Sequence, residues 1–187
     1  MKKLILASAS PRRRELMKEA GLEFEIIKSD FEENLEDDVF YYEKIEALAL
    51  GKAKDVAAKT EKDALVIAAD TVVVLHGKIL TKPQDKSDAY NMIAALSGDI
   101  HQVVTAVAVI DVLSGKTVVE STTTNVEFKK IPPAKIEEYV NTDEPYDKAG
   151  AYAIQGLASV FVKNVDGCHK NVVGLSTDTL LKVLNDF

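Results

Sequence analysis

The N-terminal residues 4–17 read LILASASPRRRELM and contain three kinds of sequence in direct succession. Residues 4–7 form a short apolar run typical of a buried strand. Ser10 and Pro11 are residue types preferred at the N-cap and the first position of a helix, and apolar residues follow at helical spacing. The segment therefore predicts a strand, a tight turn and a helix that ends at Gly21.

The rest of the chain continues this alternation of strand-like and helix-like patterns. The patterns predict strands at residues 24–27, 64–75, 103–113 and 117–128, and helices at residues 45–57, 85–96, 133–140 and 179–184. A Gly-rich stretch at residues 150–174 contains an apolar run at residues 160–165. Ser114 and Gly115 separate two β-branched segments and predict a hairpin turn. The sequence thus predicts an α/β fold with one long, mixed sheet flanked by helices.

Composition excludes several classes of protein. The 187 residues include 23 Lys and Arg against 30 Asp and Glu, a formal net charge of −7. This balance argues against nucleic-acid or membrane partners, which need a cationic face. No apolar run approaches the roughly 20 residues that span a bilayer, and no secretory signal is visible, so we expect a cytoplasmic protein. The single cysteine, Cys168, excludes an internal disulfide, and neither it nor His101 or His169 has a partner that indicates catalysis.

Three successive arginines, Arg12, Arg13 and Arg14, fall in the first turn of the predicted helix. Positive charge there opposes the helix dipole by about 0.3–1 kcal/mol per exposed residue. A bound phosphate reverses the sign, because the hydroxyls of Ser8 and Ser10, free backbone N–H groups and a guanidinium can all point at one anion. A solvated basic face is the alternative, but the complete strand–turn–helix unit favours an anion site.

Asp70 interrupts the otherwise apolar run of residues 64–74. An ionised carboxylate in a buried strand is costly unless it is paired, hydrogen-bonded or bound to a metal. In one alternative the strand ends at Ala69 and Asp70 caps a turn. The β-branched run that follows favours instead a carboxylate at a strand edge or bulge beside a cleft.

Two lysines and an acidic loop complete the candidate site. Lys52 lies within a predicted helix and Lys82 follows a strand end, and each alone is typical of an exposed lysine. Together with the arginines and Asp70 they form the mixture that neutralises a triphosphate and holds a divalent ion. Glu32 and Glu33 are possible additional metal ligands.

Nine motifs occur in a characteristic order. They are LASASPRRREL (residues 6–16), KA (52–53), ADTVV (69–73), KP (82–83), LSG (96–98), HQVVT (101–105), DEP (143–145), DKAGAYAIQG (147–156) and VGL (173–175). In this order, and across nearly the whole chain, they resemble the Maf family of nucleoside triphosphate pyrophosphatases. Two departures are Thr81 before the KP motif and Ser176 where a proline is usual, and the second bears on the start of the last helix.

The resemblance implies hydrolysis of a nucleoside triphosphate to the monophosphate and pyrophosphate. It further implies a divalent cation, Mg²⁺ or Mn²⁺, a homodimer, and a fold similar to that of inosine triphosphate pyrophosphatases. A single domain over residues 1–187, with two lobes around a nucleotide cleft, is expected. Residues 148–152 with Gln155 resemble the branch that acts on dTTP and UTP rather than the 7-methyl-GTP branch.

The same match gives individual residues their expected roles. Asp70 resembles the proton acceptor, and it is also expected, with Glu33, to hold the metal; how Asp70 divides between these two roles stays open. The positions that resemble determinants of nucleotide preference are Arg12, Thr71 and Gln155. The positions expected to line the phosphate and metal site are Ser8, Arg13, Glu33, Lys52 and Lys82.

Two other classes of function remain as alternatives. One is a nucleotide-binding regulator without turnover, since the Maf family has also been associated with inhibition of septum formation. A regulator needs cations for the phosphates but no positioned base, so Asp70 together with Lys52 and Lys82 favours the enzyme. The other is a structural or interaction module, which the arginines at a helix start disfavour.

Overall fold

A mixed seven-stranded sheet runs along the molecule in the computed structural model, which describes residues 2–35, 37–61 and 63–187. The strands are β1 (Lys3–Leu6), β2 (Phe24–Ile26), β3 (Ala64–Leu75), β4 (Lys78–Leu80), β5 (Ile100–Asp111), β6 (Thr117–Phe128) and β7 (Val162–Asp166). The helices are α1 (Pro11–Glu19), α2 (Tyr42–Ala57), α3 (Lys86–Leu96), α4 (Pro133–Val140), α5 (His169–Val173) and α6 (Thr177–Leu184), with short 3₁₀ helices η1 (Glu144–Asp147), η2 (Ala149–Ala151) and η3 (Leu157–Phe161).

The strand order is β2-β1-β3-β5-β6-β7, and β4 pairs separately with β3. Strand β1 is parallel to both of its neighbours, because α1 and α2 carry the chain back across the sheet between successive strands. The pairs β3–β5, β5–β6 and β6–β7 are antiparallel. The predicted α/β class with one long mixed sheet is confirmed.

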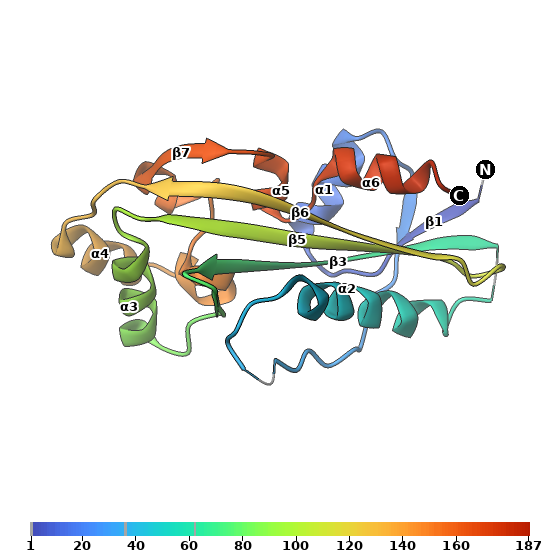
Figure 1. Ribbon diagram of the computed structural model, residues 1–187, viewed down its shortest axis with the longest axis horizontal. Helices are drawn as coiled ribbons and strands as arrows, with labels where there is room; N and C mark the ends of the chain where they lie inside the picture. Colours follow the sequence, from blue (N-terminus) through green and yellow to red (C-terminus); the bar gives the residue numbers. More distant parts are fainter. Residues whose placement is uncertain (1, 36, 62) are drawn as a thin grey trace.

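Each face of the sheet is covered by helices (Figure 1). Because side chains alternate along a strand, Ile67 and Ala69 of β3 join one core, and Val66 and Ala68 join the other. Helix α2 covers the second face, while α1, α3, α4, α5 and α6 contribute buried side chains to the first. Such burial on both faces explains the nearly continuous apolar sequence of β3.

The edge of β3 that faces β1 is interrupted. Strand β1 ends at Leu6, opposite Ile67, and β4 pairs with β3 only from Val73 onwards. Among the described strands, none pairs with residues 68–72 on that side, although the pairing with β5 continues without a bulge. Asp70 therefore lies at an open strand edge, as expected, and not at a bulge.

Most element bounds agree with those predicted, and β3 and β6 match them at both ends. Strand β5 begins at Ile100, earlier than predicted, and ends at Asp111, whose side chain accepts hydrogen bonds from Ser114 Oγ and Leu113 N in the hairpin turn. Helix α6 begins at Thr177 because the Ser176 side chain caps it. The apolar run at residues 160–165 spans the end of η3 and most of β7, and the sequence patterns indicate neither α5 nor the 3₁₀ helices.

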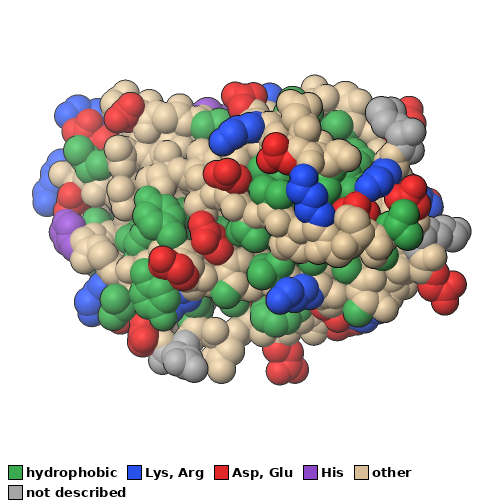
Figure 2. Space-filling view, turned by 45° about the vertical axis from the view of Figure 1, so that its right-hand side comes forward, with side chains coloured by type: hydrophobic (Ala, Val, Ile, Leu, Met, Phe, Trp, Pro, Cys, Tyr) green, Lys and Arg blue, Asp and Glu red, His purple; other side chains and the backbone are tan. Residues whose placement is uncertain are grey.

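Two surface properties bear on the expected partners. Within the described parts of the chain, no helix is both long and apolar enough to cross a membrane. On the face shown in Figure 2, Lys and Arg side chains lie scattered among Asp and Glu. A scattered arrangement is unlike the clustered basic stripe typical of nucleic-acid-binding domains.

His101 of β5 is buried in an aromatic cluster and is only 1% exposed. Its Nε2 lies 2.6 Å from the hydroxyl of Tyr152, and its ring packs edge-to-face against Phe128. Burial lowers the pKa of His101 to about 4. The imidazole is therefore neutral in the folded protein at pH 7 and resists protonation until the medium is strongly acidic.

We predict that His101 makes the stability depend on pH between about 4 and 6.5. The unfolded chain takes up a proton near pH 6.5, whereas the folded protein does so only near 4, so acidification favours unfolding by up to about 3 kcal/mol. Urea unfolding of the parent and of His101→Gln at pH 7, 5.5 and 4.5 measures this contribution. Identical pH dependence in the two proteins would contradict the prediction.

Candidate active site

A cavity of about 540 Å³ lies at the interrupted edge of β3. Its walls come from the turn between β1 and α1, from α2 and β3, and from the segments 147–155 and 172–174. The cavity brings together nine residues expected from the sequence: Ser8, Arg12, Arg13, Glu33, Lys52, Asp70, Thr71, Lys82 and Gln155. Glu32, the other possible metal ligand, is exposed and does not line the cavity. Arg14 instead lies in a shallow surface depression beside Lys18 and Leu22.

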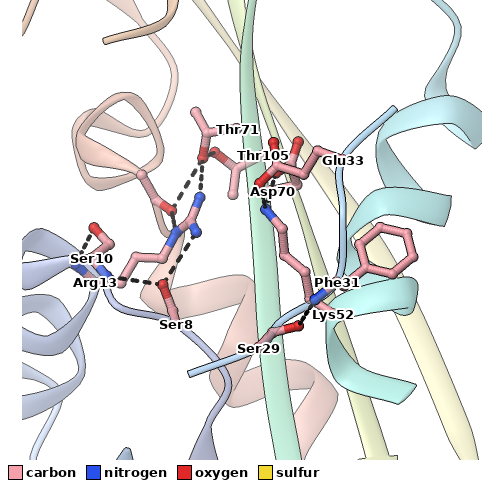
Figure 3. A network of polar contacts seen from close by, with 11 residues as sticks. Ser8, Ser10, Arg13, Ser29, Phe31, Glu33, Lys52, Asp70, Thr71 and Thr105 are labelled. Carbon is pink, nitrogen blue, oxygen red and sulfur yellow. Dashed lines mark hydrogen bonds and ion pairs between the residues drawn. The ribbon is translucent and has the colours of Figure 1, made fainter. Parts of the chain in front are cut away.

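Two carboxylates share one ammonium group inside the cavity. Lys52 of α2 places its Nζ 2.5 Å from Asp70 Oδ1 and 2.7 Å from Glu33 Oε1 (Figure 3). Asp70 is 6% exposed, because it points from β3 towards α2. The cost of burying this carboxylate is thus offset by an ion pair, one of the possibilities raised from the sequence.

The surroundings of the Lys52 ammonium shift the pKa values of Asp70 and Glu33 in different directions. Burial raises the pKa of Asp70, and the positive charges of Lys52 and Arg13 act in the opposite direction. Burial would also raise the pKa of Glu33, but its hydrogen bond to Lys52 and the charges of Lys52, Lys82 and Arg13 lower it. Glu33 is therefore the stronger acid, and Asp70 is the carboxylate better suited to accept a proton.

Arg13 links α1 to two distant parts of the chain on the other face of β3. Its Nε donates to the carbonyl of Gly174 at 2.9 Å, and its Nη2 donates to Thr71 Oγ1 at 3.0 Å. The Thr71 hydroxyl also lies 2.9 Å from Thr105 Oγ1, so its hydrogen-bonding capacity is largely used within the protein (Figure 3). Burial lowers the pKa of Arg13, while Asp70 and Glu33 oppose this effect.

The turn before α1 has the features expected of an anion site. Ser10 caps the helix by accepting from the backbone N–H of Arg13, and Ser8 Oγ accepts from the backbone N–H of Ser10. Arg12 lines the cavity together with Asp147, whose pKa is lowered by its hydrogen bond to Lys148 and by the charges of Lys148 and Arg12. The helix start and Arg12 can therefore act on the same anion.

The loop that carries Glu33 contacts α2 through a hydrogen bond from Ser29 and through the ring of Phe31. Ser29 Oγ donates to Asp55 Oδ2 at 2.9 Å, and the backbone N–H of Phe31 donates to Ser29 Oγ at 3.1 Å. The Phe31 ring lies so close to Gly51 that any β-carbon there would overlap it. Gly51 thus allows the loop to approach α2 and place Glu33 over the cavity.

Gln155 lines the cavity from the 147–155 segment, in a turn between Tyr152 and η3. Its side chain is exposed to the cavity and, within the described residues, makes no hydrogen bond. The contacts therefore give no sign that Gln155 serves only to satisfy backbone groups of its own turn. An amide with free donors and an acceptor remains available to a ligand.

The carboxylates allow a test of whether this cavity suits a divalent cation. Among the residues that the structure describes, no three His, Cys, Asp or Glu side chains form a complete metal site. Asp70 and Glu33 nevertheless already share one cation, the Lys52 ammonium. Mg²⁺ commonly binds through one or two carboxylates and completes its shell with water and substrate phosphates. This donor set suits such a cation in the presence of a phosphate ligand.

The sequence analysis gave no role to several residues that shape the site. Asn171 is fully buried, and its Nδ2 donates to the Val103 carbonyl at 2.9 Å and to Thr124 Oγ1 at 3.1 Å. These bonds fix α5 on the sheet and thereby position Gly174, the acceptor for Arg13. The VGL motif could have drawn attention to this corner, but the partners of Asn171 are distant in sequence.

Comparison with known proteins gives a consistent family. A family model described as Maf-like protein matches residues 3–187. A protein of Clostridium novyi (strain NT) named dTTP/UTP pyrophosphatase is 48% identical over 187 residues, which cover 98% of this chain and 97% of that protein. A protein of Desulforamulus reducens with the same name is also 48% identical over 187 residues, covering 100% of this chain and 97% of the relative.

Solved structures with a similar fold include two Ham1 proteins. The Staphylococcus aureus protein has a TM-score of 0.53 and 17% identity, and the match covers 99% of this chain and 98% of that one. The Coxiella burnetii protein has a TM-score of 0.52 and 15% identity, with both chains fully covered. At these identities the similarity concerns the fold alone.

We predict that the three arginines differ in function. Arg12→Ala weakens binding of inorganic triphosphate and leaves the free energy of unfolding equal or slightly higher, because a like charge leaves the helix N-terminus. Arg13→Ala lowers the free energy of unfolding by about 1–3 kcal/mol, because Gly174 and Thr71 lose a donor. Calorimetric titration and urea unfolding measure both effects, with Arg14→Ala as the matched control.

A different pattern would assign the arginines other roles. Clear destabilisation of Arg12→Ala with unchanged triphosphate affinity would make Arg12 a structural ion-pair residue. Weakened binding in Arg14→Ala as large as in Arg12→Ala would show that only overall charge matters, because Arg14 lies outside the cavity.

Proposed function

The chain belongs to the Maf-like protein family, and on this basis we propose that it hydrolyses nucleoside triphosphates, dTTP and UTP in particular, to the monophosphate and pyrophosphate. The observation that carries the proposal is the buried Asp70 carboxylate, paired with Lys52 in a cavity that also contains arginines. The names of the two relatives, dTTP/UTP pyrophosphatase, support the substrates.

The phosphate chain lies, in this proposal, between the start of α1 and the lysines. Arg12, the N-terminal end of α1 and the Ser8 hydroxyl bind one end of the triphosphate, and Lys82, which lines the same cavity, binds further along it. These groups hold the substrate in a fixed position and reduce the negative charge that repels an attacking water.

Asp70 acts as the general base. Its carboxylate accepts a proton from the water that attacks the α-phosphorus, which makes that water a better nucleophile. As the new oxygen–phosphorus bond forms, the bond from the α-phosphorus to the α–β bridging oxygen breaks, and pyrophosphate leaves with that oxygen. Lys52 holds the carboxylate in a fixed orientation through the 2.5 Å contact. Burial, which raises the pKa of Asp70, increases its affinity for the proton.

Metal dependence is part of the same proposal. Asp70 and Glu33 are the residues that would hold Mg²⁺ or Mn²⁺ when a phosphate substrate is bound, with Asp70 divided between this role and that of the proton acceptor. Such an ion supplies charge neutralisation on the phosphate oxygens. The second contact of Lys52, to Glu33, supports the pair as a cation site, because it shows two carboxylates close enough to share one positive charge.

The preference for particular nucleotide bases is assigned to Gln155, Thr71 and Arg12. Gln155 offers both donors and an acceptor, which suits the alternating acceptor and donor groups of uracil and thymine. Thr71 is engaged with Arg13 and Thr105, so its contribution to preference is to fix the cavity wall. Arg12, which lines the same cavity, completes the set of residues assigned to nucleotide preference.

The alternative of a non-catalytic regulator linked to septum formation is not favoured. The relatives are named for an enzymatic activity, and a regulator gains nothing from a buried carboxylate beside a lysine. The homodimer, the cytoplasmic location and the single domain with two lobes around a nucleotide cleft stay predictions.

We predict that Asp70→Asn retains the fold and lowers the turnover rate at least 100-fold. This is the typical loss when a general base is removed, and asparagine retains the size of the side chain. Pyrophosphate release from UTP, measured with Mg²⁺ and with Mn²⁺, tests the prediction, with Glu120→Gln on β6 as a control outside the cavity. Near-normal turnover in a folded Asp70→Asn protein would falsify the assignment.

We predict that the parent enzyme prefers UTP and dTTP over CTP and GTP, and that Gln155→Ala reduces the preference. A base that leaves buried polar groups unpaired is rejected more strongly than one that merely fits poorly. The comparison is kcat/KM for all four nucleotides in both proteins. A preference that survives the substitution unchanged removes Gln155 from base recognition, and equal efficiency on all four bases in the parent reopens the choice of substrate.

A further inference from the structure

The segment 144–158, which carries Gln155, is folded around the side chain of Glu144. Glu144 Oε2 accepts from the backbone N–H of Leu157 at 2.7 Å, and Oε1 accepts from that of Ala158 at 3.1 Å. A β-carbon at Gly156 would overlap the same carboxylate. Glu144 therefore caps the start of η3 and fixes the chain immediately after Gln155.

A second group fixes the segment before Gln155. The Tyr139 hydroxyl lies 2.9 Å from the Ala151 carbonyl and 3.1 Å from Glu144 Oε1. Tyr139 itself is buried and packs edge-to-face against Phe161 at the end of η3. One aromatic side chain of α4 thus contacts both ends of the turn.

The backbone of this segment is strained, and such a conformation needs support. Gly150 and Ala151 have φ values of 67° and 62°, in the left-handed region that a residue with a side chain adopts rarely. Gly150 packs against Val73 of β3, where a β-carbon would lie only 3.0 Å from the valine side chain. A strained turn persists only where its surroundings hold it, and it is found most often at functional sites.

The chain is held in place on both sides of Gln155. Before it, the hydroxyl of Tyr152 lies 2.6 Å from His101 Nε2. After it, Gly156 packs against the Glu144 carboxylate. The side chain of Gln155 has no hydrogen bond of its own among the described residues, so its position depends on the backbone that carries it. A shift of the backbone would move the amide relative to the ligand.

We propose that Glu144 is a positioning residue that gives the enzyme its base selectivity by holding Gln155 in place. The inference rests on the proposed function, in which Gln155 contacts the base. Among the described residues, the Glu144 carboxylate bonds only to Tyr139, Leu157 and Ala158. Lys148 of the cavity lining donates to the Glu144 backbone carbonyl at 2.9 Å, a contact that a side-chain substitution retains. The effect of the carboxylate is therefore confined to the segment that carries Gln155. Tyr139 assists by binding both the Ala151 carbonyl and the carboxylate.

The test is the ratio of kcat/KM for UTP to that for CTP. Glu144→Ala frees the two backbone N–H groups, and we expect the ratio to fall roughly tenfold to a hundredfold, through a higher KM for UTP. Glu144→Gln, whose amide oxygen can still accept one of the N–H groups, should retain part of the selectivity. Glu138→Gln is the matched control, because that carboxylate of α4 is exposed and, in the part of the chain that the structure describes, pairs only with Lys135.

The outcomes separate this inference from the function on which it rests. Selectivity unchanged in folded Glu144→Ala, or equal losses of kcat/KM for UTP and CTP, overturns the positioning role. If Glu144→Ala does not fold, Glu144→Gln and Tyr139→Phe decide by the same ratio. A parent that lacks the preference, or a Gln155→Ala variant that retains it, refutes the base-recognition proposal itself.

Discussion

The interrupted edge of β3 is the constraint on which the site depends. Strand β1 ends at Leu6, and the chain turns at once into α1, so the middle of β3 has no strand partner on that side. A carboxylate there is covered by helix α2, whose Lys52 lies 2.5 Å away. A buried pair of this kind adds little net stability, but loss of one partner is costly, by about 3–5 kcal/mol. The fold therefore retains a charged group in its interior, where apolar packing would serve stability equally well.

Much of this arrangement could be predicted from the sequence, because the relevant signals are local. A charged residue within an apolar run identified Asp70, and serine followed by proline before three arginines identified the start of α1. Each signal reflects an energetic cost that residues adjacent in the sequence do not offset. For Asp70 this is the burial of a carboxylate, and for the arginines it is positive charge at a helix N-terminus. The acidic loop indicated Glu32 and Glu33 equally, and the family resemblance singled out Glu33, whereas Gln155 came from the family motifs alone.

The remaining features depend on contacts between distant parts of the chain. The bond from Arg13 to the Gly174 carbonyl joins residues 161 positions apart, and that from Asn171 to Val103 spans 68. Helix α5 is held by such bonds and is too short to show a helical pattern of its own. His101 likewise has no suitable partner nearby in sequence, and finds Tyr152 only once β5 and the 147–156 segment are packed together. Single-sequence patterns contain no information about pairs of this kind.

The pleat of β3 explains how adjacent residues serve different parts of the cavity. Asp70 points to the face covered by α2, and Thr71, the next residue, points to the face where Arg13 and Gly174 lie. The register is fixed by the pairing of Thr71 with Thr105 on β5, whose hydroxyls are 2.9 Å apart. A slip of one residue would exchange the two faces and place the carboxylate beside the Gly174 carbonyl instead of Lys52. The long, uninterrupted pairing of β3 with β5 thus does more than build the sheet, because it keeps the ion pair and the arginine contacts on opposite sides of one strand.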